Sequence, residues 1–311
     1  MAAVGGAILV ARREVRLLSR SRAALAAGAL LVSVAWLPAV LLPLRQGSLG
    51  IASFTELLPL QIALTAVILP LLALLAGAEL FAGELEDGSL VPALTLPISR
   101  RACFVGKCLG RAATLGVAYL AAFASAGLAV AVVQGHSGWT DWAAVTGAGL
   151  VVALSTGAIG AALGSAGKGR VRAFGAALAG WIILVFVLDA VLLTIVVALA
   201  PPPPASVGEH GHDEVAAPRT ARPLQDPHAR DAELVKPKAA GLSLQLMALS
   251  PVSLYRLTCL SVTDLRPRLA LAVPGGTGAR LWLTILVGWL VWLAVPLAIG
   301  CRRFLRADLS S

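Results

Sequence analysis

The chain has 311 residues, of which 58% are hydrophobic and only 13% are charged, and its formal net charge is +9. A soluble globular protein has about 25% charged residues, so this composition excludes an ordinary soluble enzyme and indicates an integral membrane protein. A basic chain can bind nucleic acid, but in a membrane protein basic residues usually mark the cytoplasmic face. No nucleic-acid partner is predicted.

The first residues have the pattern of an amphipathic helix. Its apolar residues recur at helical spacing: Val4, Ile8, Ala11, Val15 and Leu18. Its remaining surface carries four arginines: Arg12, Arg13, Arg16 and Arg20. Such a helix is expected to lie flat at the cytoplasmic interface, with its arginines toward anionic headgroups. The alternative is a short polar segment with no fixed helix.

Six apolar runs follow, each long enough to cross about 30 Å of hydrocarbon as a helix. They cover about residues 23–44, 57–80, 109–133, 143–166, 173–200 and 281–301. Irregular backbone is not tolerated against lipid, and the runs lack the alternation of barrel strands. The predicted fold class is therefore an all-α integral membrane protein with six transmembrane helices.

Basic residues gather on one side of these spans. They precede the first span, follow the sixth, and fill the connections between spans two and three and between spans four and five. The short loops on the other side hold only Arg45. Lys and Arg in short loops mark the cytoplasmic side. Both termini are therefore predicted to be cytoplasmic, in a multi-pass protein of a bacterial inner membrane.

Residues 201–240 interrupt this pattern between spans five and six. Their eight prolines, mixed charge and few large apolar residues cannot support a packed core. We expect a disordered external loop inserted into one transmembrane domain, made of residues 1–200 and 241–311. Within the loop, His210 and His212 lie among acidic residues and could bind Cu(II) or Zn(II). The alternative is a solvated loop without metal.

Two segments near the insert raise separate questions. Residues 242–262 are apolar but do not reach a clean span, which predicts a short helix pair at the outer membrane surface. Asp189 carries a carboxylate within span five, and placing such a charged side chain in the middle of a membrane helix costs roughly 2.5–3.5 kcal/mol. It is assigned either to a transport pathway, together with Glu79, or to a hydrogen bond with a Ser, Thr or Trp of another helix.

Span four carries three glycines, Gly157, Gly160 and Gly164. Glycines at this spacing let two helix backbones approach closely. The contact is expected either within the bundle or at a dimer face.

The segment GELEDGSLVPALTLPISRRACFVGK, residues 83–107, is a charged interruption between spans two and three. No phosphate-binding loop with the spacing G-x-x-x-x-G-K-[ST] occurs in the chain. We therefore expect no enzyme activity and no directly bound cofactor. Any ATP-hydrolysing motor must be another polypeptide.

The residues of this segment resemble the corresponding loop of ABC-2 type permeases. They read Glu79-x3-Gly83-Glu84-x-Glu86-x-Gly88-Ser89-Leu90, then Leu96-Pro97-x-Ser99-Arg100, then Gly106-Lys107-x2-Gly110. The amphipathic ARREVRLLSRSR also resembles the interfacial elbow helix of that family. The resemblance implies a homodimeric permease paired with a separate ATPase dimer that binds ATP and Mg²⁺. It assigns coupling to the ATPase to these residues: Glu84, Glu86, Asp87, Gly88, Pro97, Arg100 and Lys107.

Within the family, LSPVSLYRLTCLS at residues 249–261 resembles the NosY-like branch, which serves nitrous oxide reductase maturation. The motif of that branch reads like LNPxDxYRLxNLS, and this chain departs from it at three positions: Ser250, Ser253 and Cys259. The resemblance implies contact with an external partner through Pro251, Tyr255 and Arg256. It also implies export of a sulfur species, or work on a periplasmic copper-delivery partner.

Two other functions stay open from the residues. One is an ion-coupled secondary transporter acting through Asp189, although no inverted repeat is visible in the sequence. The other is a membrane assembly or anchor protein without transport.

Overall fold

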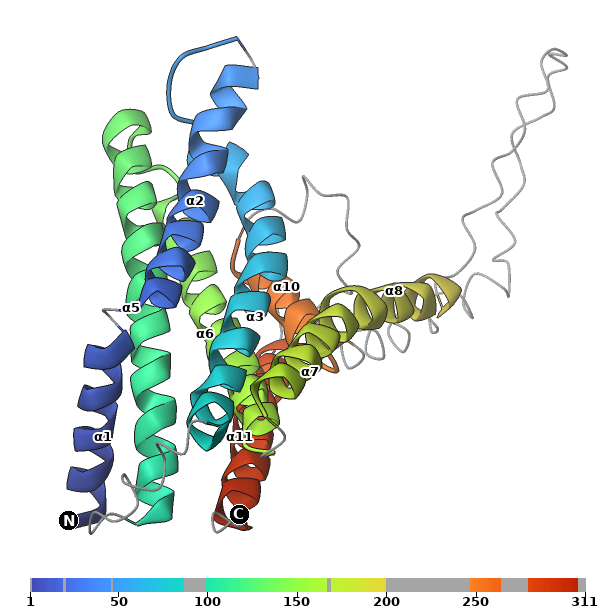
Figure 1. Ribbon diagram of the computed structural model, residues 1–311. Coiled ribbons are helices and arrows are strands. Elements are labelled where there is room, and N and C mark those ends of the chain that lie inside the picture. Colours follow the sequence, from blue (N-terminus) through green and yellow to red (C-terminus); the bar gives the residue numbers. More distant parts are fainter. Residues whose placement is uncertain are drawn as a thin grey trace, which may run out of the picture.

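The computed structural model describes residues 2–18, 21–45, 47–86, 99–166, 169–199, 247–263 and 279–306. Its elements are helices, and the described ranges contain no strand (Figure 1). In chain order they are α1 Ala2–Leu18, α2 Arg22–Arg45, α3 Phe54–Glu86, α5 Arg100–Gln134, α6 Trp139–Gly164, α7 Arg170–Ile182, η1 Ile183–Val187, α8 Leu188–Leu199, α10 Pro251–Val262 and α11 Ala279–Arg306. The predicted insert at 201–240 lies outside the described residues.

Six helices are long and apolar enough to cross a membrane: α2, α3, α5, α6, the helix from Arg170 to Leu192, and α11. The predicted all-α class with six spans is thereby confirmed. Helix α1 begins and α11 ends at the same end of the bundle (Figure 1), as an even number of spans requires. That this end is cytoplasmic stays a prediction, and we call it the predicted cytoplasmic end.

Two helices extend beyond the apolar runs at this end. Helix α3 continues to Glu86, and α5 begins at Arg100, where the Ser99 hydroxyl accepts a hydrogen bond from the backbone N–H of Ala102 at 3.2 Å. Such a cap satisfies one of the unpaired donors of a helix N-terminus. Much of the charged interruption is therefore helical, and residues 87–98 between the two helices lie outside the described residues.

Glycines bring α3 and α6 into backbone contact. A Cβ atom at Gly160 would lie 2.2 Å from the Leu74 carbonyl oxygen, and one at Gly164 would lie 2.2 Å from that of Ala78. From the other side, a Cβ at Gly77 would lie 2.2 Å from the Gly157 oxygen. Only glycine allows these approaches. The expectation that the glycines of span four pack within the bundle is confirmed.

Helix α1 packs along the first half of α5, nearly in line with the bundle axis (Figure 1). The amphipathic pattern therefore forms a helix, as predicted. Its flat orientation at a membrane surface is not confirmed, because the buried contact of α1 is with another helix.

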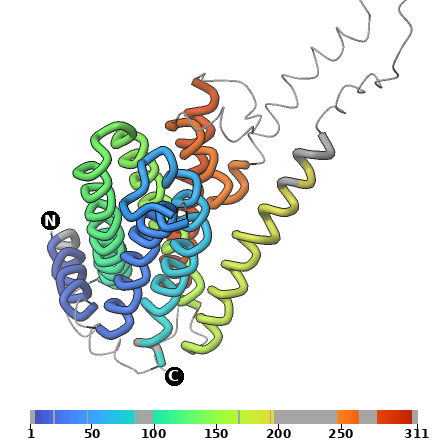
Figure 2. Tube along the Cα trace, turned by 90° about the horizontal axis from the view of Figure 1, so that it is seen from above, coloured from blue at the N-terminus to red at the C-terminus, as the bar shows by residue number. Residues whose placement is uncertain are grey.

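Span five is built from α7, a π-helical turn and α8. It leans away from the other helices in both views (Figures 1 and 2). The indole Nε1 of Trp181 donates to the Val67 carbonyl at 2.8 Å and ties α7 to α3. A π-turn, which often occurs at functional sites, directly precedes Asp189.

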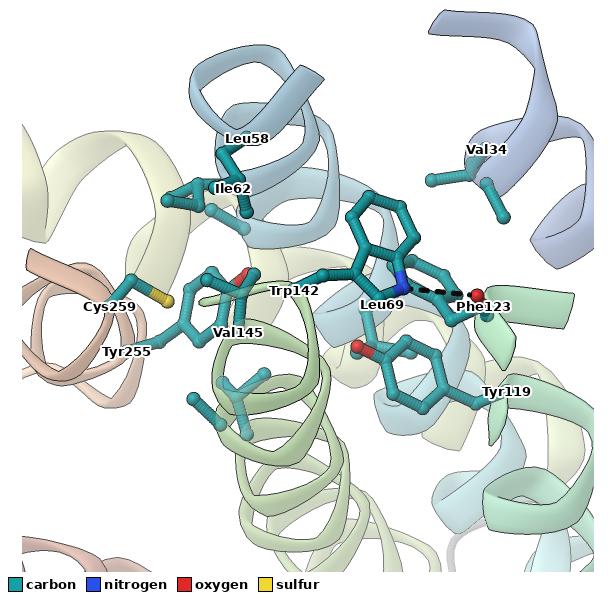
Figure 3. Close-up of a cluster of buried hydrophobic side chains, with 14 of the residues drawn as sticks. Val34, Leu58, Ile62, Leu69, Tyr119, Phe123, Trp142, Val145, Tyr255 and Cys259 are labelled. Atoms are coloured by element: carbon teal, nitrogen blue, oxygen red, sulfur yellow. Dashed lines mark hydrogen bonds between the residues drawn. The ribbon is translucent and has the colours of Figure 1, made fainter. Parts of the chain in front are cut away.

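The largest core cluster of the described residues lies among α2, α3, α5, α6, α10 and α11, and Figure 3 shows part of it. There Trp142 packs near Phe123 and Tyr119, and its Nε1 donates to the Phe123 carbonyl at 3.2 Å. Tyr255 and Cys259 reach this cluster from α10. Helix α10 thus contributes to the interior of the bundle.

The prediction of a surface helix pair at 242–262 is therefore wrong in its location. The one described helix there, α10, is buried over most of its length. It begins at Pro251, and the Ser250 hydroxyl caps it by accepting from the backbone N–H groups of Val252 and Ser253 at 3.2 and 3.3 Å. Apolar residues occur on nearly every face of α10, so the bundle covers it. Residues 242–246 lie outside the described part.

Candidate functional site

Five charged side chains from four helices form a continuous series of contacts toward the predicted cytoplasmic end, and a sixth, Glu86, joins it through the backbone N–H of Arg170. In order they are Lys107, Glu14, Arg111, Glu79, Arg170 and Glu86. We call this series the ion-pair chain. It connects α1, α5, α3 and α7.

The first contact lies between α1 and α5. A Cβ at Gly106 would be 2.5 Å from the Ala7 oxygen, and one at Gly110 would be 2.6 Å from the Cβ of Glu14, so these glycines let the helices approach. Glu14 Oε2 then lies 3.5 Å from Lys107 Nζ, and their side chains are only 9% and 5% exposed. Burying a charge costs several kcal/mol, so each of the two charges needs its partner.

Arg111 forms the middle of the chain. It stands one helical turn after Lys107, on the same face of α5. Its Nη2 donates to Glu14 Oε1 at 3.3 Å, and its Nη1 lies 3.6 Å from Glu79 Oε2. Its Nε is buried with no hydrogen-bond partner in the structure. Arg111 thus joins the α1–α5 contact to α3.

The last two contacts hold the start of α7 against the end of α3. Arg170 Nη2 lies 2.8 Å from Glu79 Oε1, and the backbone N–H of Arg170 donates to Glu86 Oε2 at 2.7 Å. The N-cap residue of α7 is Gly169, at φ 84°, and it has no side chain to cap the helix. Glu86 supplies the missing acceptor from another helix, where a negative charge also favours the helix dipole.

The two halves of the ion-pair chain differ in strength. The Lys107–Glu14 pair is buried, whereas Arg170 and Glu79 are 47% and 27% exposed. An exposed pair contributes about 0–1 kcal/mol. The chain therefore combines a buried α1–α5 ion pair with a more exposed α3–α7 ion pair, and the α3–α7 contact is also held by buried apolar residues, among them Ala78 and Ala177. A displacement at the end of α3 would act directly on α7.

A cavity of about 620 Å³ lies beside the ion-pair chain, between α2 and α3. Glu14, Glu79, Arg111 and Arg170 line one end of it. The structure thus places Glu79 at a cavity, as a pathway residue would be. The transport role of Glu79 stays a prediction.

The residues predicted to couple to an ATPase are found in three situations. Asp87, Gly88 and Pro97 lie outside the described residues, and the side chain of Glu84 is also not described. Arg100 is exposed in the first turn of α5. Glu86 is exposed but already bound to the start of α7.

Lys107 does not lie at a surface, where a coupling residue was expected. It is 4% exposed, and it is buried because α1 covers this face of α5. Direct contact between Lys107 and a partner would require α1 to move. Its observed role is to pair with Glu14.

Asp189 lies at the junction of α8 and α10. Its Oδ1 accepts a 2.6 Å hydrogen bond from the Ser253 hydroxyl, and its Oδ2 pairs with the Arg256 guanidinium. This arrangement matches the structural interpretation of Asp189, a hydrogen bond to a serine of another helix. It also adds an ion pair that the sequence did not predict. A role in transport stays a prediction.

We expect Asp189→Leu and Arg256→Leu each to lower the free energy of unfolding by about 1 kcal/mol, because each leaves a partly exposed charge unpaired. The double variant should lose less free energy of unfolding than the sum of the two single variants, because neither charge remains. Thermal unfolding in detergent measures this. If Asp189→Leu abolished function while Arg256→Leu had no effect, a pathway role would explain Asp189 better.

The residues predicted to contact an external partner are mostly buried. Tyr255 is fully buried and Pro251 is buried, so neither side chain is available in this conformation. Burial raises the pKa of the Tyr255 phenol well above its usual value and that of the Cys259 thiol to about 12, so both stay neutral. Arg256 alone of the three is substantially exposed, with 41% of its side chain accessible. Its contact with a partner stays a prediction.

The predicted metal ligands His210 and His212 lie outside the described residues. Within the described ranges, no group of three His, Cys, Asp or Glu side chains is arranged to hold a metal ion.

Sequence reasoning missed the acidic partner of Lys107. Glu14 is the only Asp or Glu in the first 55 residues and stands among arginines. An isolated acid on the face of a basic helix was the available signal. The roles of Arg111 and Arg170 had no local signal, because basic residues at helix ends look alike in sequence.

Comparison with known proteins gives consistent matches. The sequence profile described as "ABC-2 family transporter protein" matches residues 8–309. A "Probable ABC transporter permease protein NosY" from Stutzerimonas stutzeri is 33% identical over 174 residues, which are 54% of this chain and 61% of that protein. Its counterpart from Pseudomonas aeruginosa is 31% identical over 175 residues, 53% of this chain and 60% of that protein. The matched region thus spans less than two thirds of each relative.

Proposed function

This chain belongs to the ABC-2 family of transporter proteins, and from that membership we propose that it is the membrane-spanning permease subunit of an ABC exporter. A separate ATPase dimer would bind ATP and Mg²⁺ and supply the energy. The permease would act as a homodimer in the inner membrane, with both termini in the cytoplasm. Its own side chains would transmit motion and carry out no covalent chemistry.

The observation that best supports this proposal is the ion-pair chain at the end of α3. Helix α3 runs into residues 87–98, the segment assigned to ATPase contact by its resemblance to the family loop. Glu79 and Glu86 on the same helix hold the start of α7. A push on this segment would therefore reach span five through these two polar contacts and through the apolar contact of α3 with α7.

Charge reversal at Glu84 and Asp87 tests the proposed contact. The variant Glu84→Lys/Asp87→Lys is expected to reduce co-purification of the ATPase subunit by about tenfold or more, because repulsion at a contact that pairs charges costs several kcal/mol. The thermal unfolding temperature of the permease alone should not change. Glu86→Lys should lower that temperature as well, because it removes the cap of α7.

Glu56→Lys is the matched control. Glu56 is an exposed acid at the opposite end of the same helix, α3, where it accepts a hydrogen bond from the Ser53 backbone N–H at 3.3 Å, so its reversal removes a helix cap as Glu86→Lys does. Its reversal should leave ATPase binding unchanged. Equal loss of binding in both variants, or full binding after Glu84→Lys/Asp87→Lys, would contradict the proposal.

The finer assignment rests on the resemblance to the NosY-like branch and on the two relatives named NosY. We extend the proposal to export that supports copper- and sulfur-site maturation of a periplasmic enzyme such as nitrous oxide reductase, with a periplasmic maturation protein as partner. An ion-coupled transporter working through Asp189 is less well supported, because Ser253 and Arg256 already occupy that carboxylate.

A further inference from the structure

The cavity between α2 and α3 exists because the first half of α2 has small side chains. Before Leu31, no residue of α2 is buried. On the α2 side, the residues that line the cavity are small up to Gly28 and larger beyond it: Ala23, Ala24, Ala26, Ala27, Gly28, Leu30 and Leu31. Such a volume, about 620 Å³, lies in the range of ligand pockets.

The lining changes character along the cavity. At one end are Glu14, Glu79, Arg111 and Arg170. About 10 Å further along α3, at a rise of about 1.5 Å per residue, the wall is Leu72, and aliphatic side chains of α2 and α5 surround it. A ligand that satisfies both ends has a charged head and an aliphatic body. Those are the properties of a membrane lipid.

The charged end offers both signs in equal number, two carboxylates and two guanidinium groups. Arg111 Nε is a buried donor without a partner, and Arg170 is half exposed. A phosphate would satisfy these donors. Each oxygen of the Glu79 carboxylate already pairs with one arginine, Arg111 or Arg170, but a carboxylate has about four acceptor sites, and at 27% exposure those left over can receive hydrogen bonds from an ammonium group. A zwitterionic headgroup with a free ammonium therefore fits better than a purely anionic one.

We propose that this cavity binds one membrane phospholipid of the phosphatidylethanolamine class, with its phosphate at Arg111 and Arg170, its ammonium at Glu79, and an acyl chain between α2 and α3. The site shares Glu79, Arg111 and Arg170 with the ion-pair chain, but the proposal does not rest on ATPase coupling, since lipid binding needs no partner subunit. A bound lipid would fill the space that separates α2 from α3.

The test is lipid retention by the purified protein, measured by native mass spectrometry after incubation with phosphatidylethanolamine, phosphatidylcholine or phosphatidylglycerol of the same acyl chains. Phosphatidylethanolamine should be retained best, at one lipid per protein chain. Phosphatidylcholine carries the same charges but cannot donate hydrogen bonds from its quaternary nitrogen. Preference for phosphatidylglycerol, or equal retention of all three, would overturn the proposal.

Gly28→Leu blocks the cavity without disturbing the fold, because a Cβ at Gly28 meets no atom within 4 Å. We expect it to reduce phosphatidylethanolamine retention by about fivefold or more. That is the factor expected when one or two methylene groups of the acyl chain are no longer buried in the cavity. Ala29→Leu is the control, since Ala29 is the next residue, is exposed and does not line the cavity. Retention that is unchanged in Gly28→Leu, or lost equally in both variants, would show that the lipid binds elsewhere.

Discussion

Replacing Gly160 by valine is expected to prevent the six helices from assembling into a stable bundle. A Cβ atom there would lie 2.2 Å from the Leu74 carbonyl oxygen and 3.0 Å from the Ala78 nitrogen, both backbone atoms of α3. Backbone cannot swing aside as a flexible side chain does, so α3 and α6 would have to separate. Overpacking costs about 1–3 kcal/mol where side chains can adjust, and we expect at least the upper end here.

The measurement is the yield and thermal unfolding temperature of detergent-solubilised protein. Gly164→Val should behave like Gly160→Val, because its Cβ would lie 2.2 Å from the Ala78 oxygen. Gly147→Val is the matched control in the same helix, since a Cβ at Gly147 meets nothing within 4 Å. A stable Gly160→Val protein would contradict the observed α3–α6 contact. If only dimer formation were lost, the glycines would belong to a dimer face.

Replacing Glu14 by glutamine is expected to destabilise the contact between α1 and α5 by about 3 kcal/mol, because the buried Lys107 would face a neutral amide in place of a carboxylate. Lys107→Met should cost less, since Glu14 keeps Arg111 at 3.3 Å and the methionine fills the same space. The double variant Glu14→Gln/Lys107→Met should be more stable than Glu14→Gln alone. That recovery identifies the buried charge of Lys107, facing a neutral glutamine, as the source of the loss.

Thermal unfolding of the four proteins forms a double-mutant cycle that gives the coupling free energy of this pair. Arg13→Gln serves as the control, because Arg13 is exposed on the other face of α1. If Glu14→Gln unfolded at the wild-type temperature, the Lys107–Glu14 pair would contribute nothing to stability. If Arg13→Gln were equally harmful, the effect would belong to α1 as a whole and not to the pair.

The buried pair also explains why a Gly-Lys-x-x-Gly pattern begins span three. Gly106 and Gly110 allow α1 to approach, and Lys107 between them provides the charge that Glu14 meets. The resemblance to a family motif assigned Lys107 to ATPase coupling. The structure shows instead a residue that anchors the N-terminal helix, so any influence of Lys107 on coupling would pass through α1.

The exposed half of the ion-pair chain, around Arg170, is placed to pass movement from α3 to α7. Arg170 contacts Glu79 and Glu86, both on the last turns of α3, and it is the first residue of α7. The side-chain pair itself is weak, whereas buried residues such as Ala78 and Ala177 hold α3 and α7 together deeper in the bundle. The same end of α3 precedes the segment proposed to meet the ATPase. A movement of that segment would therefore be passed to span five by polar and apolar contacts together.

The sequence by itself determined the six spans, the absence of a nucleotide-binding motif and the capacity of the span-four glycines for close helix contact, though not which helix they meet. These properties are readable locally, because the hydrocarbon thickness dictates the length of an apolar helix and a missing side chain permits close approach. Only the tertiary structure decided which charges meet. Glu14 and Lys107 are 93 residues apart, Glu79 and Arg170 are 91 apart, and Asp189 and Arg256 are 67 apart. Local hydrophobicity carries no information about such pairs, since they depend on which helix faces pack together. For the same reason the burial of α10 and Tyr255 could not be read from a segment whose composition suits a membrane surface as well as a bundle interior.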